Sequence, residues 1–213
     1  MSDIFDAPAA HADIDTDGNF AVLGDDINII EKDPTLTKVV IGAGWDTNAF
    51  DSQVMDLDVS VFLLNKDGMT RTDEDFVFYN MRETPDKAVR HHGDSRSGAG
   101  DGDDETITVD LQGISFEIMQ VMIVLSIYKG YEREQDMSMV RNGYIRIVNA
   151  DNDMEIVRFK LAHDYLEGHT ETGMMVAALN REGPKWHFKP LAEFAPDGLG
   201  EIATKYGCII KEQ

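Results

Sequence analysis

Cysteine, long apolar runs and targeting signals are scarce or missing in this sequence, and each shortage excludes a class of protein. The single cysteine, Cys208, allows no internal disulfide and cannot build a thiolate zinc site. The longest apolar run, near residues 121–127, is far shorter than a membrane span, and no cationic and apolar signal peptide opens the chain. We therefore expect a cytoplasmic protein without a transmembrane segment.

Basic residues are also few, with 19 Lys and Arg against 40 Asp and Glu, so the formal net charge is −21. Such an acidic protein lacks the basic footprint needed to bind nucleic-acid backbones or anionic lipid directly. Multivalent cations are its natural partners. Hydrophobic residues still make up 42% of the 213 residues, enough for the core of one domain, so global disorder is not expected.

Short apolar or alternating segments between Gly, Asn and Asp turns predict a mainly β protein. Many of these segments are rich in β-branched and aromatic residues. Their number and spacing favour a two-sheet β-sandwich with a few short helices. The expected helices are 115–120 and 199–205, and the expected strands are 27–30, 38–41, 59–64, 76–79, 106–111, 121–128, 144–148, 155–161, 174–180 and 185–189.

The first 24 residues differ from the rest, and we assign them to an acidic, flexible arm preceding a sandwich domain at residues 25–213. Residues 1–19 contain five aspartates and no Lys or Arg. Asp13, Asp15 and Asp17 match the start of an EF-hand calcium loop, but its twelfth position is Gly24 instead of the bidentate Glu. Chance acidity is therefore the preferred interpretation, with a weak accessory site as the alternative.

Carboxylates gather in three other places. Asp46 follows Gly44-Trp45, and Asp56 and Asp58 lead into an expected strand, where alternation turns both the same way. Residues 93–105 contain five acids and four glycines, which let a loop fold its oxygens inward. Hard oxygen ligands on a flexible loop favour Ca²⁺. The alternative is a solvated surface loop, which is as good an explanation for Asp56 and Asp58 taken alone.

Several of these segments resemble the TerD family of bacterial tellurium-resistance and stress proteins. The resemblance runs from about Asp25 to Cys208 and includes the sequences at 40–46, 56–64, 75–80, 93–105 and 144–149. It implies a β-sandwich that binds Ca²⁺ through clustered aspartates at one end, with no established catalytic activity. The ligand candidates that it carries over are Asp46, Asp56, Asp58, Asp94, Asp101, Asp103, Asp104 and Glu105.

The resulting hypothesis is a calcium-binding, cytoplasmic stress-response protein of the tellurium-resistance type that acts as a binding or scaffold module. Other stress-response proteins or a calcium-bridged membrane surface are the partners considered. The alternative is a metal-dependent hydrolase or phosphotransferase that uses the same carboxylates. Because the sequence has no recognisable pairing of base and nucleophile, and no phosphate-binding glycine motif, we expect a protein that is not an enzyme.

Overall fold

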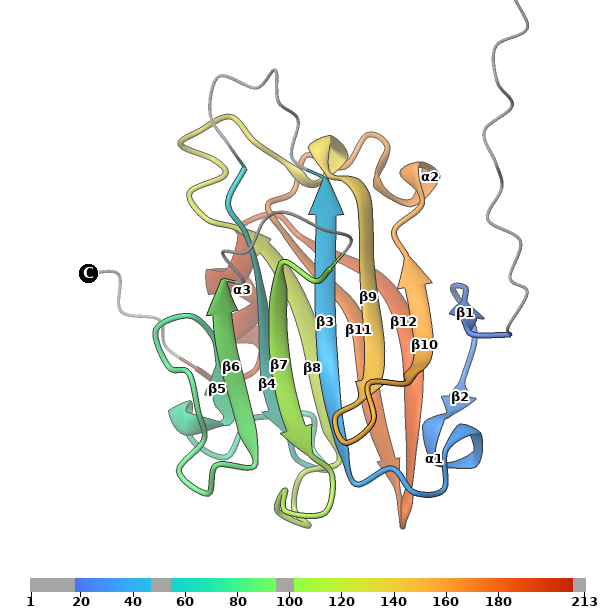
Figure 1. The fold of residues 1–213 in the computed structure, drawn as a ribbon. Coiled ribbons are helices and arrows are strands. Elements are labelled where there is room, and N and C mark those ends of the chain that lie inside the picture. The colour runs from blue at the N-terminus through green and yellow to red at the C-terminus, as the bar shows by residue number, and fades with distance from the viewer. Residues whose placement is uncertain (1–17, 47–54, 95–101, 209–213) are drawn as a thin grey trace, which may run out of the picture.

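The computed structural model describes residues 18–46, 55–94 and 102–208. In this part of the chain two six-stranded sheets pack face to face, with short helices at their margins (Figure 1). The predicted mainly β, two-sheet sandwich is confirmed. No helix in the described ranges is long and apolar enough to cross a membrane.

The first sheet, sheet A, has the strand order β1-β10-β9-β3-β7-β6. Its pairings are antiparallel except for that of β1 with β10. The strands are β1 (Phe20–Ala21), β3 (Lys38–Asp46), β6 (Val89–Asp94), β7 (Glu105–Asp110), β9 (Arg141–Asn149) and β10 (Glu155–Lys160).

The second sheet, sheet B, has the order β2-β12-β11-β8-β4-β5 and is antiparallel throughout. Its strands are β2 (Ile27–Asn28), β4 (Leu57–Leu64), β5 (Phe76–Val77), β8 (Gln120–Ile127), β11 (Gly173–Glu182) and β12 (Lys185–Ala195). The helices are α1 (Ile29–Lys32), α2 (His163–Leu166) and α3 (Gly198–Lys205).

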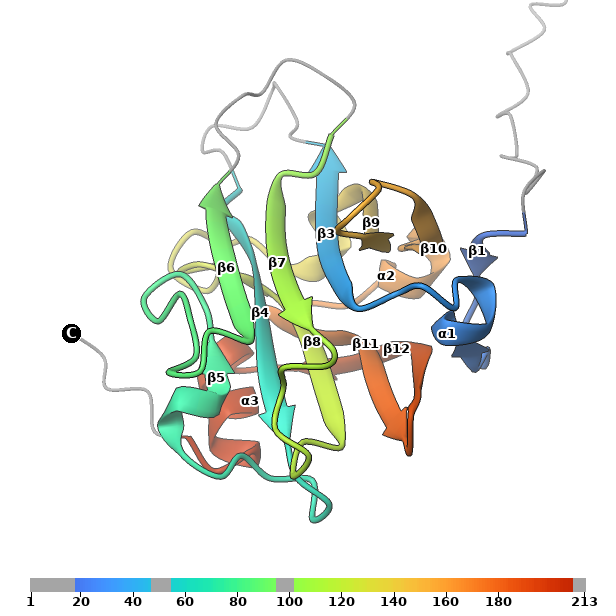
Figure 2. The same ribbon diagram turned by 60° about the horizontal axis from the view of Figure 1, so that its bottom comes forward.

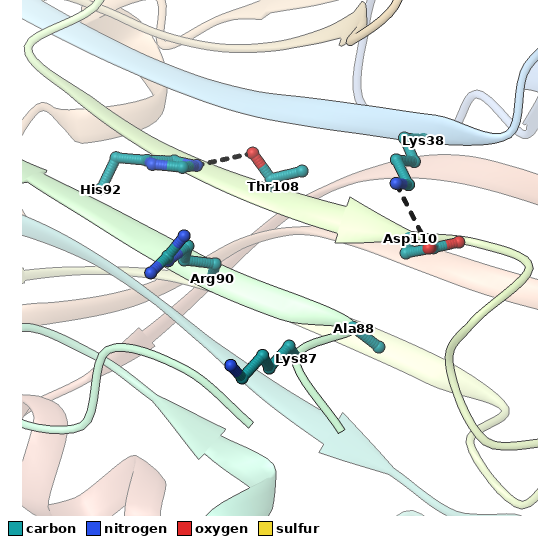
Figure 3. A pocket seen from close by; sticks show the side chains of 7 residues that line it. All are labelled: Lys38, Lys87, Ala88, Arg90, His92, Thr108 and Asp110. Atoms are coloured by element: carbon teal, nitrogen blue, oxygen red, sulfur yellow. Dashed lines mark hydrogen bonds and ion pairs between the residues drawn. The ribbon is translucent and has the colours of Figure 1, made fainter. Parts of the chain in front are cut away.

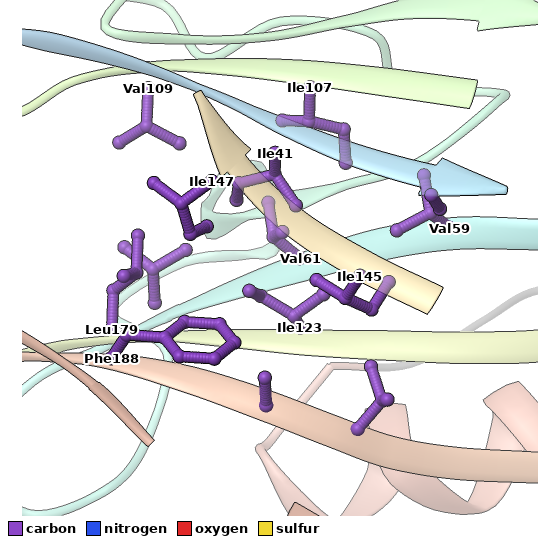
Figure 4. Packing of buried hydrophobic residues seen from close by; sticks show 14 of the residues in the cluster. Ile41, Val59, Val61, Ile107, Val109, Ile123, Ile145, Ile147, Leu179 and Phe188 are labelled. Carbon is purple, nitrogen blue, oxygen red and sulfur yellow. The ribbon is translucent and has the colours of Figure 1, made fainter. Parts of the chain in front are cut away.

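The main core lies between the sheets and is built by alternation along each strand. In β7, for example, Glu105, Ile107 and Val109 are buried, whereas Thr106 and Thr108 are partly exposed. Apolar side chains from both inner faces meet there, among them Ile41, Ile107 and Ile147 from sheet A and Val61, Ile123 and Leu179 from sheet B (Figure 4). Helix α3 covers part of the outer face of sheet B, so β4 and β8 are buried on both faces.

Several local predictions need correction. No helix forms at 115–120, because the Ser115 hydroxyl accepts a hydrogen bond from the Glu117 N–H in a turn. The expected strand 27–30 ends early, since Asn28 caps helix α1 by accepting from the N–H groups of Ile30 and Glu31. Strand β1 falls inside the segment that we assigned to the arm, while residues 1–17, including the EF-hand-like aspartates, lie outside the described residues.

Candidate functional site

Four strand ends meet at one end of the sandwich, which we call the acidic end. Strands β3 and β6 finish there, and β7 and β4 begin there (Figure 2). The register shows this directly, because Ala43 of β3 and Asp94 of β6 pair with Glu105 from its two sides. The acidic end thus contains Asp46, Asp56, Asp58, Asp94 and residues 103–105.

The Glu105 side chain points into the sandwich and satisfies a backbone group at an unpaired edge of strand β4. Its carboxylate Oε2 accepts a hydrogen bond of 2.6 Å from the Val59 N–H on the opposite sheet. The buried His91 ring lies beside it, with its Nε2 3.0 Å from the Val59 carbonyl oxygen and 3.6 Å from Glu105 Oε2. Strand β5 pairs with β4 only at Val61 and Phe62, so two side chains satisfy the Val59 backbone where no strand continues.

The histidine tautomer follows from the same geometry. His91 Nδ1 lies 2.8 Å from the Gly93 N–H and must accept from it. The ring proton therefore belongs on Nε2, where it is donated to the Val59 carbonyl. In the sequence, the inward orientation of Glu105 is indicated only by its position two and four residues before the apolar Ile107 and Val109, which places all three on one face of the strand.

Asp103 lies on the opposite side of sheet A from Glu105. Its two oxygens accept from the Arg146 guanidinium at 2.7 and 3.0 Å, and Oδ1 also accepts from the Tyr144 hydroxyl at 3.0 Å. The carboxylate sits over Gly42, where an added Cβ would be only 2.2 Å away. Burial and the negative charge of Asp103 raise the pKa of Tyr144 to about 12.

Asp104 and Asp46 each form hydrogen bonds to residues of a neighbouring strand. Asp104 extends the pairing of β7 with β3, donating its N–H to Ala43 O and accepting from the Trp45 N–H at 2.8 Å. The Asp46 carboxylate is exposed and accepts from the Asn142 side-chain amide at 2.6 Å. Asp46 therefore offers oxygen to solvent, whereas Asp104 helps to hold the start of β7.

Asp56 and Asp58 lie on the other sheet. Asp58 is an even number of residues from Phe62 and Leu64 along β4, so its side chain lies with theirs on the outer face of sheet B. It is partly exposed there. Asp56 is exposed just before the strand begins. The pKa of the nearby Tyr79 hydroxyl is raised, mainly by burial and then by the negative charges of Asp58 and Asp56.

The predicted ligands whose side chains the structure describes are therefore gathered at one end but not around one point. Within residues 18–46, 55–94 and 102–208, no three His, Cys, Asp or Glu side chains are arranged to hold a metal ion. Asp103 and Glu105 face opposite sides of sheet A. Asp101 lies outside the described residues. The donor chemistry suits Ca²⁺, but the described side chains alone do not complete a site.

The fold and this end of the molecule define a class of two-sheet β-sandwich proteins with acidic strand ends. The TerD domain model matches residues 22–206. The chain is 36% identical over 184 residues to the tellurium resistance protein TerD of Serratia marcescens, covering 86% of this chain and 94% of that protein. It is 38% identical over 185 residues to general stress protein 16U of Bacillus subtilis (strain 168), covering 86% and 94% respectively.

A solved structure agrees with this assignment. The crystal structure of a homologue of the telluride resistance protein TerD from Streptomyces coelicolor A3(2) matches with a TM-score of 0.62 at 20% identity. The match covers 82% of this chain and 99% of that one, and at this identity it shows the fold alone. Together with the sequence matches, it completes the assignment: the chain belongs to the TerD family, which contains tellurium-resistance and general stress proteins.

Proposed function

We propose that this TerD-family chain binds Ca²⁺ at the acidic end and acts in the cytoplasm as a stress-response binding module instead of a catalyst. The observation that carries the proposal is the register that brings β3, β6 and β7 together at Glu105, next to the start of β4. It places the exposed Asp46 and Asp56 at the same end of the molecule as Asp94.

The eight predicted residues would then have two kinds of role. Asp46, Asp56, Asp58, Asp94 and Asp101 would supply oxygens to the ion. Asp103, Asp104 and Glu105 would hold the frame, because their carboxylates already accept hydrogen bonds from Arg146, Trp45 and Val59. When bound, Ca²⁺ supplies positive charge that offsets the repulsion among the carboxylates.

A role as a module fits the charge of the chain. Carboxylates repel one another and also repel acidic partner proteins and anionic membrane surfaces. Occupancy by Ca²⁺ would reduce that repulsion at one end only. We propose that the calcium-bound end then meets either another stress-response protein or a membrane surface bridged by the ion.

Calorimetric titration of the chelator-stripped full chain with Ca²⁺ and Mg²⁺ tests the proposal. The informative variant is Asp56→Asn, and the matched control is Asp67→Asn, which removes one exposed carboxylate from the turn after β4. We expect Asp56→Asn to weaken Ca²⁺ binding about tenfold or more and Asp67→Asn to change it less than about twofold. Equal losses would mean a diffuse ion atmosphere and would refute a site.

The enzyme alternative is tested by phosphatase and nuclease assays in Mg²⁺ and Mn²⁺. We expect no turnover above buffer. Turnover that disappears in Asp56→Asn but persists in Asp67→Asn would overturn the non-catalytic assignment.

A further inference from the structure

A small pocket opens on the outer face of sheet A, away from the acidic end. Its volume is about 210 Å³. Strands β6 and β7 and the start of β3 form its floor (Figure 3). The polar residues that line it are Lys38, Lys87, Arg90, His92, Thr108 and Asp110.

Strand register explains why these side chains share one surface. Arg90 pairs with Thr108, and Lys38 pairs with Asp110, so both pairs lie on the outer face of sheet A. The register shifts between His91 and Gly93, a β-bulge. Alternation along β6 turns His91 into the core and leaves His92 exposed on the outer face, with its Nε2 2.7 Å from Thr108 Oγ1.

The charge of the pocket is opposite to that of the chain. Three cations and one titratable histidine line the pocket with a single carboxylate, and Glu83 beside it pairs with Arg90, whereas the whole chain has 40 acids and 19 bases. That carboxylate, Asp110, is already satisfied, since Oδ1 accepts from the N–H groups of Gln112 and Gly113 and Oδ2 lies 3.6 Å from Lys38 Nζ. The pocket therefore attracts an anion.

Arg90 and Lys87 are the cations best able to meet a ligand. Arg90 is 3.3 Å from Glu83, but both side chains are well exposed, and such surface pairs exchange at little cost. Lys87 is exposed and adopts a left-handed φ of 59°, a conformation that glycine adopts more easily. Both residues line the pocket (Figure 3).

Size and donor chemistry narrow the choice of anion. The pocket has room for about seven water molecules and is smaller than the ~300–1,000 Å³ typical of sites for drug-sized ligands. A guanidinium fork beside ammonium, hydroxyl and imidazole groups matches a tetrahedral oxyanion. We propose that this pocket binds a phosphate dianion, either free or as the terminal monoester of a larger molecule.

The first experiment is an NMR titration of the full chain with inorganic phosphate, in chelator and at matched ionic strength in NaCl. The variants are Arg90→Gln and Lys87→Gly, where glycine keeps the left-handed backbone and removes the whole side chain with its ammonium. The matched control is Lys129→Gly, because Lys129 is also exposed and has a φ of 52°.

We expect phosphate to shift the backbone amide resonances of the pocket residues Arg90 and Thr108, and each pocket variant to weaken binding roughly fivefold or more. Lys129→Gly should stay within about twofold of the unmodified chain. If NaCl shifts these resonances as much as phosphate does, or if Lys129→Gly loses as much affinity as Lys87→Gly, the pocket is not a phosphate site.

A second arm separates the two sources of phosphate. Sedimentation with phosphatidylcholine vesicles containing phosphatidate, a monoester, is compared with vesicles containing phosphatidylglycerol, a diester, both in chelator. Binding to phosphatidate that Arg90→Gln abolishes assigns a lipid monoester, and a pocket-dependent response to inorganic phosphate alone assigns a free ligand. Absence of a pocket-dependent response in both arms overturns the proposal, and the chelator keeps this outcome independent of Ca²⁺ binding.

Discussion

Glu105 tests most sharply whether an acid at the acidic end supports the fold or binds the metal. By resemblance it is a calcium ligand, but its carboxylate lies inside the sandwich, 2.6 Å from the Val59 N–H. Glu105→Ala would leave that buried N–H without its acceptor at the place where β5 no longer pairs with β4. Glu105→Gln would keep an oxygen acceptor and remove only the charge.

The magnitude follows from the cost of an unsatisfied buried backbone group. Losing the acceptor costs about 1–3 kcal/mol, and losing the buried side chain adds to this, so we expect Glu105→Ala to lower the free energy of unfolding by about 2–4 kcal/mol. At ~2–4 °C per kcal/mol for a domain of this size, the melting temperature falls by roughly 4–16 °C. Glu105→Gln should cost about 1 kcal/mol, since a charge-assisted bond becomes a neutral one.

The assay combines urea unfolding with calcium calorimetry. Glu132→Ala is the control, because it removes one acid whose side chain is 70% exposed. We expect Glu105→Gln to bind Ca²⁺ within about twofold of the unmodified chain once both are folded. Unchanged stability together with a large loss of Ca²⁺ affinity in Glu105→Gln would refute the structural role and restore Glu105 as a ligand.

Three further predictions concern the same end of the molecule. Asp103→Ala should lower the free energy of unfolding by about 2 kcal/mol in urea titrations, because Arg146 and Tyr144 lose their shared acceptor. Adding Arg146→Met should recover part of this loss. If the losses from the two substitutions were fully additive, Asp103 and Arg146 would not interact as an ion pair. Because the pKa of Tyr144 is raised to about 12 in the folded state, its contribution to stability is complete below pH ~10 and is lost as pH rises toward 12. Between pH ~10 and 12, the free energy of unfolding should therefore fall more steeply with pH for the unmodified chain than for Tyr144→Phe. Identical slopes for the two proteins would contradict this. The melting temperature of the chelator-stripped protein should rise most in Ca²⁺, less in Mg²⁺ and least in NaCl of matched ionic strength. At a hundredfold excess of Ca²⁺ over Kd, the stabilisation should be about 2.7 kcal/mol. Equal rises in all three salts would indicate that the acidic end is a solvated surface.

Alternation made most of the sandwich predictable from sequence. Strand β9 shows it clearly, since Ile145 and Ile147 face the core while Tyr144 and Arg146 lie on the outer face of sheet A. Strand β6 was not predicted, because its second inward position is His91, which hides the apolar pattern. A polar residue is tolerated there only because the Val59 backbone and Gly93 satisfy both ring nitrogens.

The gathering of acids at one end was predictable, but their division among faces was less so. Asp103 lies before the first residue of β7, so the alternation of the strand does not fix the direction of its side chain. The space above Gly42 admits the carboxylate between Arg146 and Tyr144. Glu105 could have been placed correctly, because it is two residues before Ile107 and so shares its buried face. The family resemblance carried both acids over as ligands, and in the structure each carboxylate already accepts hydrogen bonds from protein donors.

The two proposed sites lie along one strand, and their separation decides whether they interact. Arg90 and Asp94 are four residues apart in β6, about 13 Å along an extended strand. A dianion and a divalent cation at that distance interact by about 1.3 kcal/mol in water, and screening with a Debye length of ~8 Å at physiological salt reduces this to roughly 0.3 kcal/mol. The screened interaction is smaller than thermal energy, so an anion in the basic pocket and a cation at the acidic end can be bound nearly independently. Alternation along β6 makes this possible, because it directs His91 into the frame of the acidic end and the neighbouring His92 toward the basic pocket.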